Sequence, residues 1–122
     1  MKYMLLIHHD EQLWNAHTEA ERQDIYREYR ELIQKLESRG QYLEGDQLQA
    51  ADTAKIVRVR DGQQLLTDGP FAETREQIGG FFLIEAKNLD DAKSIAAQIP
   101  SARTGSIEIR PVVAEAAEPA TA

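Results

Sequence analysis

The first strand of this chain is apolar on both of its faces. Residues 2–8 read KYMLLIH, an almost unbroken apolar run. Successive side chains of a strand point to opposite faces, so Met4 and Leu6 share one face and the odd-numbered residues of the run share the other. Such a strand has to be covered on both sides, which predicts a central place in its sheet.

A strong helix signal follows this strand. Thr18 and Glu21 form a capping box, in which each side chain satisfies a backbone N–H group of the other residue. An apolar stripe at the helical spacing of three and four comes next and predicts a helix from Glu19 to Arg39. Gly40 ends it, because glycine adopts the left-handed C-terminal conformation without a Cβ penalty. The stripe comprises Ile25, Tyr26, Tyr29, Leu32, Ile33 and Leu36.

The rest of the chain predicts a second helix and several extended segments. Asn88 caps a helix expected from Leu89 to Ile99, and Pro100 stops it. The extended candidates are rich in β-branched and aromatic residues. They comprise residues 41–48, 54–60, 63–67, 78–86 and 106–113.

Glycines mark two local features of these segments. Asp61 and Gly62 form a dipeptide typical of two-residue hairpin turns, so the segments on either side of it are expected to pair. Gly79 and Gly80 interrupt an aromatic strand, which indicates a β-bulge or the close approach of another backbone.

The order of elements predicts the fold class of residues 1–113. Strand, helix, three or four strands, helix and strand make an α+β domain: a ferredoxin-like antiparallel sheet with two helices on one face and an added hairpin. The helices cover one face only, whereas the first strand is apolar on both. A second copy that closes face to face would supply the missing cover, which predicts a homodimer of the dimeric α/β barrel type. Residues 114–122, AEAAEPATA, are expected to form a mobile C-terminal tail.

Composition excludes several partners. The chain has 14 basic and 21 acidic side chains, and its net charge of −7 repels nucleic acid. The basic residues Lys55, Arg58 and Arg60 alternate with valines, as on the solvated side of a strand. The N-terminal apolar run is too short for a signal peptide or a membrane helix, so we expect no membrane partner. Cysteine is absent, which is compatible with a reducing cytoplasm, the location we expect.

The turn after the hairpin carries the most specific local composition. The segment TDGPF places a carboxylate, a glycine, a proline and an aromatic ring directly after a strand. In one interpretation the turn is structural: Asp68 bonds its own backbone and Phe71 plugs the core. In the other, Asp68 stands at the mouth of a pocket as a general base or ligand acceptor. The residues that we expect to line that pocket are Thr67, Gly69, Pro70, Phe71, Glu73 and Arg75.

Two histidines end the first strand. His8 and His9 lie beside Asp10 and Glu11, a composition that suggests a metal site. However, adjacent residues of a strand point to opposite faces, so the two imidazoles cannot chelate one ion while the strand continues. We therefore expect no metal and no cofactor. One of the two histidines can face a pocket as an acid or base near neutral pH, with a simple strand-end hydrogen bond as the alternative.

The run TDGPFAETREQIGGFFLIE, from Thr67 to Glu85, resembles the DGPF branch of the YCII-related family. The similarity begins with KYMLLI, continues through VRVRDG and closes with IEIRPV, so it covers about residues 1–113. The resemblance implies a dimeric α/β barrel of the ferredoxin-like type. This agrees with the fold expected from the strand and helix pattern.

The resemblance implies two different functions. The broader YCII-like group includes a proposed histidine and aspartate active site and a dehydrochlorinase of chlorinated hydroquinones, but its histidine lies on the first helix, where this chain has Tyr29. Acid–base chemistry, such as dehydrochlorination or another lyase-type reaction, would have to use Asp68 with His8 or His9. Members of the DGPF branch are also fused to sigma-70-type transcription factors, which implies a sigma-factor partner. We favour a ligand-binding or accessory homodimer over an enzyme.

Overall fold

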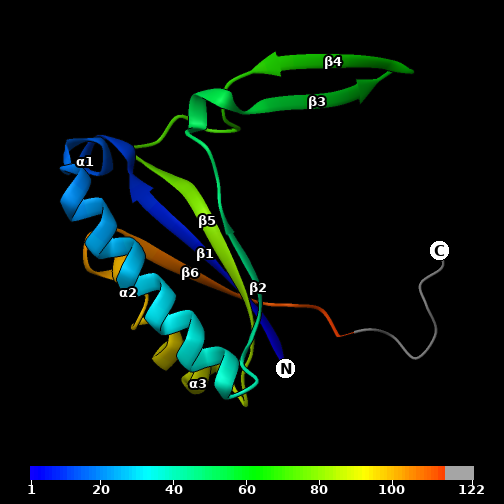
Figure 1. The fold of residues 1–122 in the computed structure, drawn as a ribbon. Helices are drawn as coiled ribbons and strands as arrows, with labels where there is room; N and C mark the ends of the chain where they lie inside the picture. Colours follow the sequence, from blue (N-terminus) through cyan, green and yellow to red (C-terminus); the bar gives the residue numbers. More distant parts are fainter. Residues whose placement is uncertain (115–122) are drawn as a thin grey trace.

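The main body of the protein is a four-stranded antiparallel sheet with helices on one face (Figure 1). The computed structural model describes residues 1–114. The strands of this sheet are β1 (Lys2–Asp10), β2 (Tyr42–Gln47), β5 (Glu76–Glu85) and β6 (Ser106–Pro111), in the order β2-β5-β1-β6. The two-sided apolar strand β1 is therefore central, as predicted. The topology is consistent with a ferredoxin-like α+β fold.

Two helices cover one face of the sheet, α2 (Glu19–Ser38) and α3 (Leu89–Ala96) (Figure 1). The predicted capping box is present: the Glu21 backbone N–H donates to Thr18 Oγ1 at 3.1 Å, and the Thr18 backbone N–H donates to Glu21 Oε1 at 2.7 Å. Gly40 takes a φ of 70° just beyond the helix, the left-handed conformation that glycine tolerates. Local chemistry thus defines both ends of α2.

Two helical segments differ from the prediction. A short helix α1 (Glu11–Ala16) follows β1 directly, and Asp10 caps it by accepting a hydrogen bond from the backbone of its first turn. Six residues are too few to show a helical apolar period, so the sequence pattern did not indicate it. Helix α3 ends at Ala96 instead of Ile99, and a 3₁₀ helix η2 (Pro100–Arg103) begins at the proline predicted as its stop.

The core lies between the sheet and the helices. Leu5 of β1, Leu36 of α2, Ile84 of β5 and Ile99 after α3 expose no surface. Tyr3, Leu5 and Ile7 of β1 contribute to this core, so they face the helices, as strand alternation requires.

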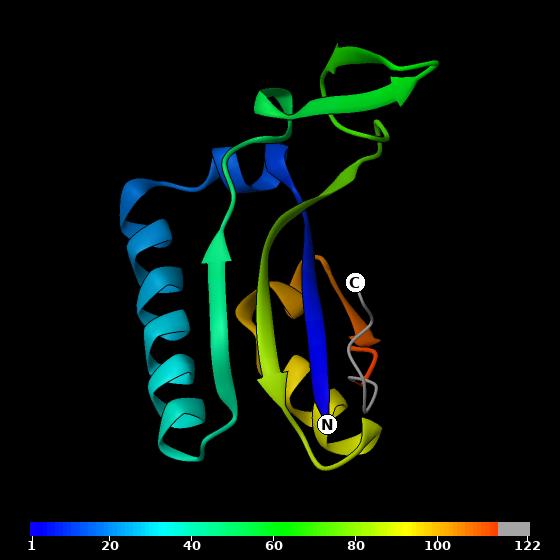
Figure 2. The same ribbon diagram turned by 90° about the vertical axis from the view of Figure 1, so that its right-hand side faces the viewer.

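The opposite face of the sheet has no cover among the described residues, and Figure 2 looks onto it. Met4 pairs with Leu83, Leu6 with Phe81 and His8 with Ile78 across β1 and β5, so these side chains share one face. The apolar members are half-buried, except Ile78, which is 41% exposed. We call this surface the open face; its apolar residues are Met4, Leu6, Ile78, Phe81 and Leu83.

The predicted bulge is present where β1 and β5 pair. The register shifts between Ile7 and His8, so that Gly79 is inserted into β5. Gly79 and Gly80 are both buried. A Cβ atom on Gly79 would collide with the ring of His9, and one on Gly80 would lie 2.8 Å from the carbonyl oxygen of Asp46. The glycine pair therefore serves both predicted purposes, a bulge and close packing of neighbouring groups.

The predicted hairpin forms a separate two-stranded sheet. Strands β3 (Lys55–Arg60) and β4 (Gln63–Asp68) are joined by Asp61 and Gly62, which both have positive φ. The hairpin projects from the body on the side opposite the helices (Figure 1). Every residue of its two strands except Ile56 is exposed.

The C-terminal segment predicted as a mobile tail lies outside the described residues from position 115 onward. Within residues 1–114, no helix has the length and apolar character that spanning a bilayer requires. The predicted cytoplasmic location stays a prediction.

Candidate functional site

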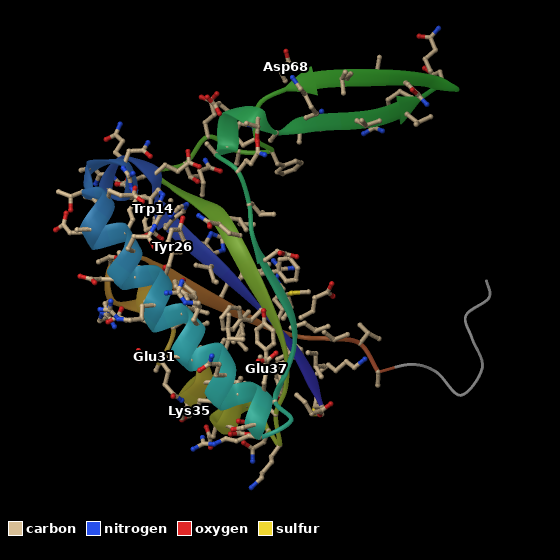
Figure 3. All side chains as sticks on the ribbon, in the orientation of Figure 1. Trp14, Tyr26, Glu31, Lys35, Glu37 and Asp68 are labelled. Carbon is tan, nitrogen blue, oxygen red and sulfur yellow. The ribbon has the colours of Figure 1, made fainter. Side chains whose placement is uncertain are left out.

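A cavity of about 190 Å³ lies between α2 and the helix-facing side of the sheet. Its walls are mainly apolar and aromatic. Trp14 of α1 packs edge to face on Tyr26 of α2, with ring centroids 5.5 Å apart, and both side chains lie between helix and strands in Figure 3. The lining residues are Ile7, His9, Trp14, Ile25, Tyr26, Tyr29, Ile33, Tyr42, Gly45, Asp46, Gln47, Gly79, Gly80, Phe82 and Ser101.

Glycines in the sheet leave room for this cavity. Gly45 of β2 and Gly79 and Gly80 of β5 all line it, and none projects a side chain toward α2. A Cβ atom on Gly45 would meet the Tyr42 hydroxyl and would lie 2.8 Å from the carbonyl oxygen of Phe81. Around the cavity, neighbouring groups thus pack directly against bare backbone, and a side chain at any of these three positions would displace them and change the site.

His9 is the predicted site residue that the structure places in the cavity. Its ring lies against Gly79 and is half-buried. His8 and His17 each form a hydrogen bond through the ring, whereas the ring nitrogens of His9 have no hydrogen-bond partner among residues 1–114. A neutral imidazole with no such partner offers one hydrogen-bond donor and one acceptor to a bound molecule.

Two phenols add polar groups to the apolar wall. The Tyr29 hydroxyl and Ser101 Oγ form a hydrogen bond at 2.7 Å. Burial raises the pKa of Tyr29. Burial is also the main reason why the pKa of Tyr42 is raised, and the negative charge of Asp46 is the second reason. Both phenols therefore stay protonated and neutral at physiological pH.

The raised pKa of Tyr29 predicts a loss of stability at alkaline pH. The phenol of the unfolded chain ionises near pH 10, about its ordinary pKa, while the native phenol keeps its proton. Its stabilising effect is complete below that pH and is lost as pH rises toward the native pKa. Urea unfolding of the wild type should show that the free energy of unfolding falls between about pH 8 and about pH 11. In the Tyr29→Phe protein this fall should be smaller.

Ser101→Ala is the control for this measurement. It removes the hydrogen bond and keeps the titrating phenol, so its stability should still fall at alkaline pH. A Tyr29→Phe protein that loses stability as steeply as the wild type would show that Tyr29 is not the group responsible.

His8 lies on the open face, away from the cavity. Its Nε2 atom is 2.9 Å from Glu108 Oε1, and Arg110 Nε donates to Glu108 Oε2 at 2.7 Å. Hydrogen bonds from Arg110 and then from His8 hold the pKa of Glu108 below its ordinary value. The two adjacent histidines thus point to opposite sides, because β1 continues to Asp10. Among residues 1–114, no group of three or more metal-ligating side chains is placed to hold an ion.

Asp68 lies on the hairpin, apart from both histidines. Its side chain is 79% exposed, and Lys55 Nζ donates to Asp68 Oδ1 at 2.8 Å. Figure 3 shows Asp68 at a distance from Trp14 and Tyr26 of the cavity wall. One copy of the chain therefore does not bring Asp68 together with His8 or His9, and joint chemistry of these groups stays a prediction.

The turn after Asp68 is held by its backbone. Gly69 has a φ of 99°, a conformation that favours glycine, and its N–H donates to the carbonyl oxygen of Ala54 at 2.8 Å. Phe71 is 82% exposed. The interpretation of Phe71 as a plug in the core is therefore wrong, because the turn stands on the projecting hairpin and has no core beside it.

The other residues predicted to line a pocket also lie outside the cavity. Arg75 comes closest to the sheet, with its Nε atom 3.7 Å from Asp10 Oδ2 at the end of β1. Pro70 is half-buried within the turn, while Thr67 and Glu73 are exposed.

Several cavity residues were missed by sequence reasoning. Tyr26 and Tyr29 fall on the apolar stripe that predicts helix α2, and such a stripe by itself indicates a helix face turned inward, not a binding site. Their polar tips were the available signal, since a tyrosine on such a stripe brings a hydroxyl to the boundary of the core. Trp14 and Ser101 come from short helices whose sequences show no apolar period. Only the folded chain shows that both line one cavity.

Comparison with known proteins gives two matches of nearly full length. A family model described as the YCII-related domain matches residues 1–116. An uncharacterized protein of Rhizobium meliloti (strain 1021) is 33% identical over 114 residues, which cover 92% of this chain and 92% of that protein.

Proposed function

The chain belongs to the YCII-related family, and we propose that it is a homodimeric binding protein for a small, mainly apolar molecule held in the cavity between α2 and the sheet. One observation carries this proposal. His9 presents an imidazole without a partner, among the described residues, to a cavity whose other walls are largely apolar. Polar groups in such surroundings are the usual means of orienting a bound molecule.

The cavity walls favour a neutral ligand with a single ring. A volume of about 190 Å³ exceeds the roughly 150 Å³ of an apolar protein cavity known to accept benzene. The phenols of Tyr29 and Tyr42 are uncharged, and no lysine or arginine of the described residues lines the cavity to balance an anion. A hydroxyl on the ring would satisfy one nitrogen of His9. Phenol is therefore a suitable probe.

The proposed dimer closes through the open face into an α/β barrel. The central residues Met4, Leu6, Phe81 and Leu83 form an apolar strip that no described part of the chain covers. Contiguous apolar strips of this kind on soluble proteins mark interaction sites. A two-fold axis would place the strip of one copy on the same strip of another.

Titration with phenol tests the ligand site. As phenol is added, we expect the ring signals of His9 in a ¹H–¹³C NMR spectrum to shift until the site is saturated. The ring signals of His8 should not shift. His9→Ala should weaken binding by about tenfold or more, which corresponds to one hydrogen bond of roughly 1.4 kcal/mol. His8→Ala is the matched control, because it removes the neighbouring imidazole on the other face.

Gly79→Ala provides a second variant at this site. The new Cβ atom would occupy the place of the His9 ring, which can swing away because it is the end of a flexible side chain. Binding should therefore be lost with little change in melting temperature. Phenol affinity that is equal in wild type, His9→Ala and Gly79→Ala would refute the proposed site.

Catalysis by His9 is a second candidate function, and the accessible imidazole favours it. In a lyase-type step such as dehydrochlorination, His9 would take a proton from the substrate while the C–Cl bond breaks, so that chloride leaves and a double bond forms. Asp68 would have to come from the hairpin of another copy. Turnover of a chlorinated hydroquinone that disappears in both His9→Ala and Asp68→Asn, but returns when the two variants are mixed, would support it. A wild-type protein that does not turn over this substrate would contradict the second candidate function. The sigma-factor partner stays a prediction.

A further inference from the structure

The projecting hairpin carries its two valines on one face and its two arginines on the other. We call residues 55–68 the arm. Val57 pairs with Leu66 across its two strands. Val59 and Gln64 lie on the same face as this pair, and so do Lys55 and Asp68, whose ion pair stands at the base of the hairpin. The opposite face carries Arg58, which pairs with Leu65, together with Ile56 and Arg60. We call Val57, Val59 and Leu66 the apolar face of the arm.

The apolar face of the arm has no cover within residues 1–114. Val57, Val59 and Leu66 are 61%, 58% and 67% exposed. A hairpin of two strands is marginally stable in water unless it packs on another surface. Alternation of apolar and charged residues is also typical of a strand with one face buried. The arm therefore has the sequence pattern of a hairpin with one buried face, but no described part of the same copy covers that face.

The direction of the arm indicates where that surface lies. The arm extends beyond the open face, on the side opposite the helices (Figures 1 and 2). Hydrogen bonds hold its base: Ala51 N–H donates to Glu11 Oε2 at 2.7 Å, and Gly69 N–H donates to the carbonyl oxygen of Ala54 at 2.8 Å. A protein seated on the open face would lie alongside the arm.

The charge of the arm favours a second copy of this chain. The arm has three basic residues and two acidic ones, whereas the whole chain has a net charge of −7. The remainder of each copy is therefore strongly acidic, and β2 presents the exposed Glu44 and Asp46 beside the open face. A basic arm and an acidic body attract each other, which steers two copies together.

We propose that the arm clasps a second copy of this chain, with its apolar face packed on the body of the partner while the two open faces close on each other. The inference rests on the dimer of the proposed function and adds a second contact to it. Because the dimer is two-fold symmetric, each copy gives one arm and receives one. The contact covers Val57, Val59 and Leu66 in the dimer.

Sedimentation equilibrium of the full chain tests the clasp. The double variant Val57→Ser/Leu66→Ser should raise the dimer dissociation constant by about tenfold or more, because two apolar contacts are lost from each arm. The matched control Gln63→Ser/Leu65→Ser changes the other face of the same hairpin, keeps its charge, and should stay within about twofold of the wild type. Equal dissociation constants for wild type and the first variant, or equal weakening by both variants, would overturn the proposal.

Cross-linking gives a readout that does not depend on affinity. The chain has no cysteine, so Leu66→Cys introduces a unique thiol for a benzophenone maleimide. In a mixture of ¹⁵N-labelled and unlabelled protein, irradiation should join the arm of one copy to the body of the other. Arg58→Cys should give far less of this product. An absence of products between copies with Leu66→Cys would also overturn the clasp.

Two further measurements separate failure of the clasp from failure of the proposed function. A Leu6→Glu protein that remains a dimer would refute closure through the open face, and the clasp with it. A monomeric Leu6→Glu protein together with a wild-type dissociation constant for Val57→Ser/Leu66→Ser would refute the clasp alone. Phenol binding should be unchanged in the arm variant, because the cavity lies on the helix side of the sheet.

Discussion

The Leu6→Glu protein should be a monomer at micromolar concentration, with a dimer dissociation constant about a hundredfold or more above that of the wild type. Leu6 lies in the middle of the open face and pairs with Phe81 on one side and Glu108 on the other. A carboxylate there would be desolvated in the dimer and would face the like charge of Glu108. The two-fold axis would repeat this cost in the second copy.

Sedimentation velocity measures this effect, and Leu89→Glu is its control. Leu89 is also exposed, but it lies in the first turn of α3 on the helix side, where a negative charge is favourable. This second variant should remain a dimer. Leu6→Ser provides a milder change in the same direction if the glutamate variant folds poorly. A dimeric Leu6→Glu protein, or loss of the dimer in both glutamate variants, would contradict the predicted interface.

Gly105→Ala should destabilise the fold by about 3 kcal/mol, the upper end of the usual cost of overpacking. A Cβ atom at this position would collide with the carbonyl oxygen of His8 and would lie 3.2 Å from the Cα of His9. Both are backbone atoms of β1, so the added methyl group could be accommodated only by moving β6 away from the central strand. The cost arises from this contact and not from a left-handed backbone.

Urea unfolding compares this variant with Gly79→Ala. The three atoms nearest to the Cβ atom of the second variant all belong to the His9 ring, which can move, so the cost should be about 1 kcal/mol or less. The comparison thus separates a glycine required by backbone packing from one required by a side chain. A smaller loss for Gly105→Ala than for Gly79→Ala would mean that β6 can yield at this contact.

Much of the fold was predictable because local chemistry determines it. Thr18 and Gly40 define the ends of α2 through their own hydrogen bonds and φ, and Asp61 with Gly62 defines the hairpin turn. The two apolar faces of β1 predicted a central strand. Helix α1 was not predictable, since its six residues show no period and Asp10 reads equally well as the end of a strand or as a cap.

The site was only partly predictable. Strand alternation required His8 and His9 to face opposite ways, but the sequence did not say which face the helices cover. The same limit applies to Asp68. Turn chemistry predicts the hairpin that carries it, but not the direction in which the hairpin projects. That direction depends on contacts at the base of the hairpin between residues distant in sequence, such as Glu11 and Ala51. The helical stripe predicts the position of Tyr29, but the hydrogen bond between Tyr29 and Ser101 joins residues 72 positions apart and has no local signal.

The two strands of the hairpin also affect how the protein behaves in solution. Within residues 1–114, neither β3 nor β4 has a second neighbour, so both present an unpaired edge that could add strands from other molecules. Lys55, Arg58 and Arg60 place positive charges along β3, and these charges repel the same edge of another hairpin. Salt screens that repulsion within about 10 Å at 0.1 M ionic strength. The colloidal stability of the protein therefore depends on low ionic strength whenever the hairpin is uncovered.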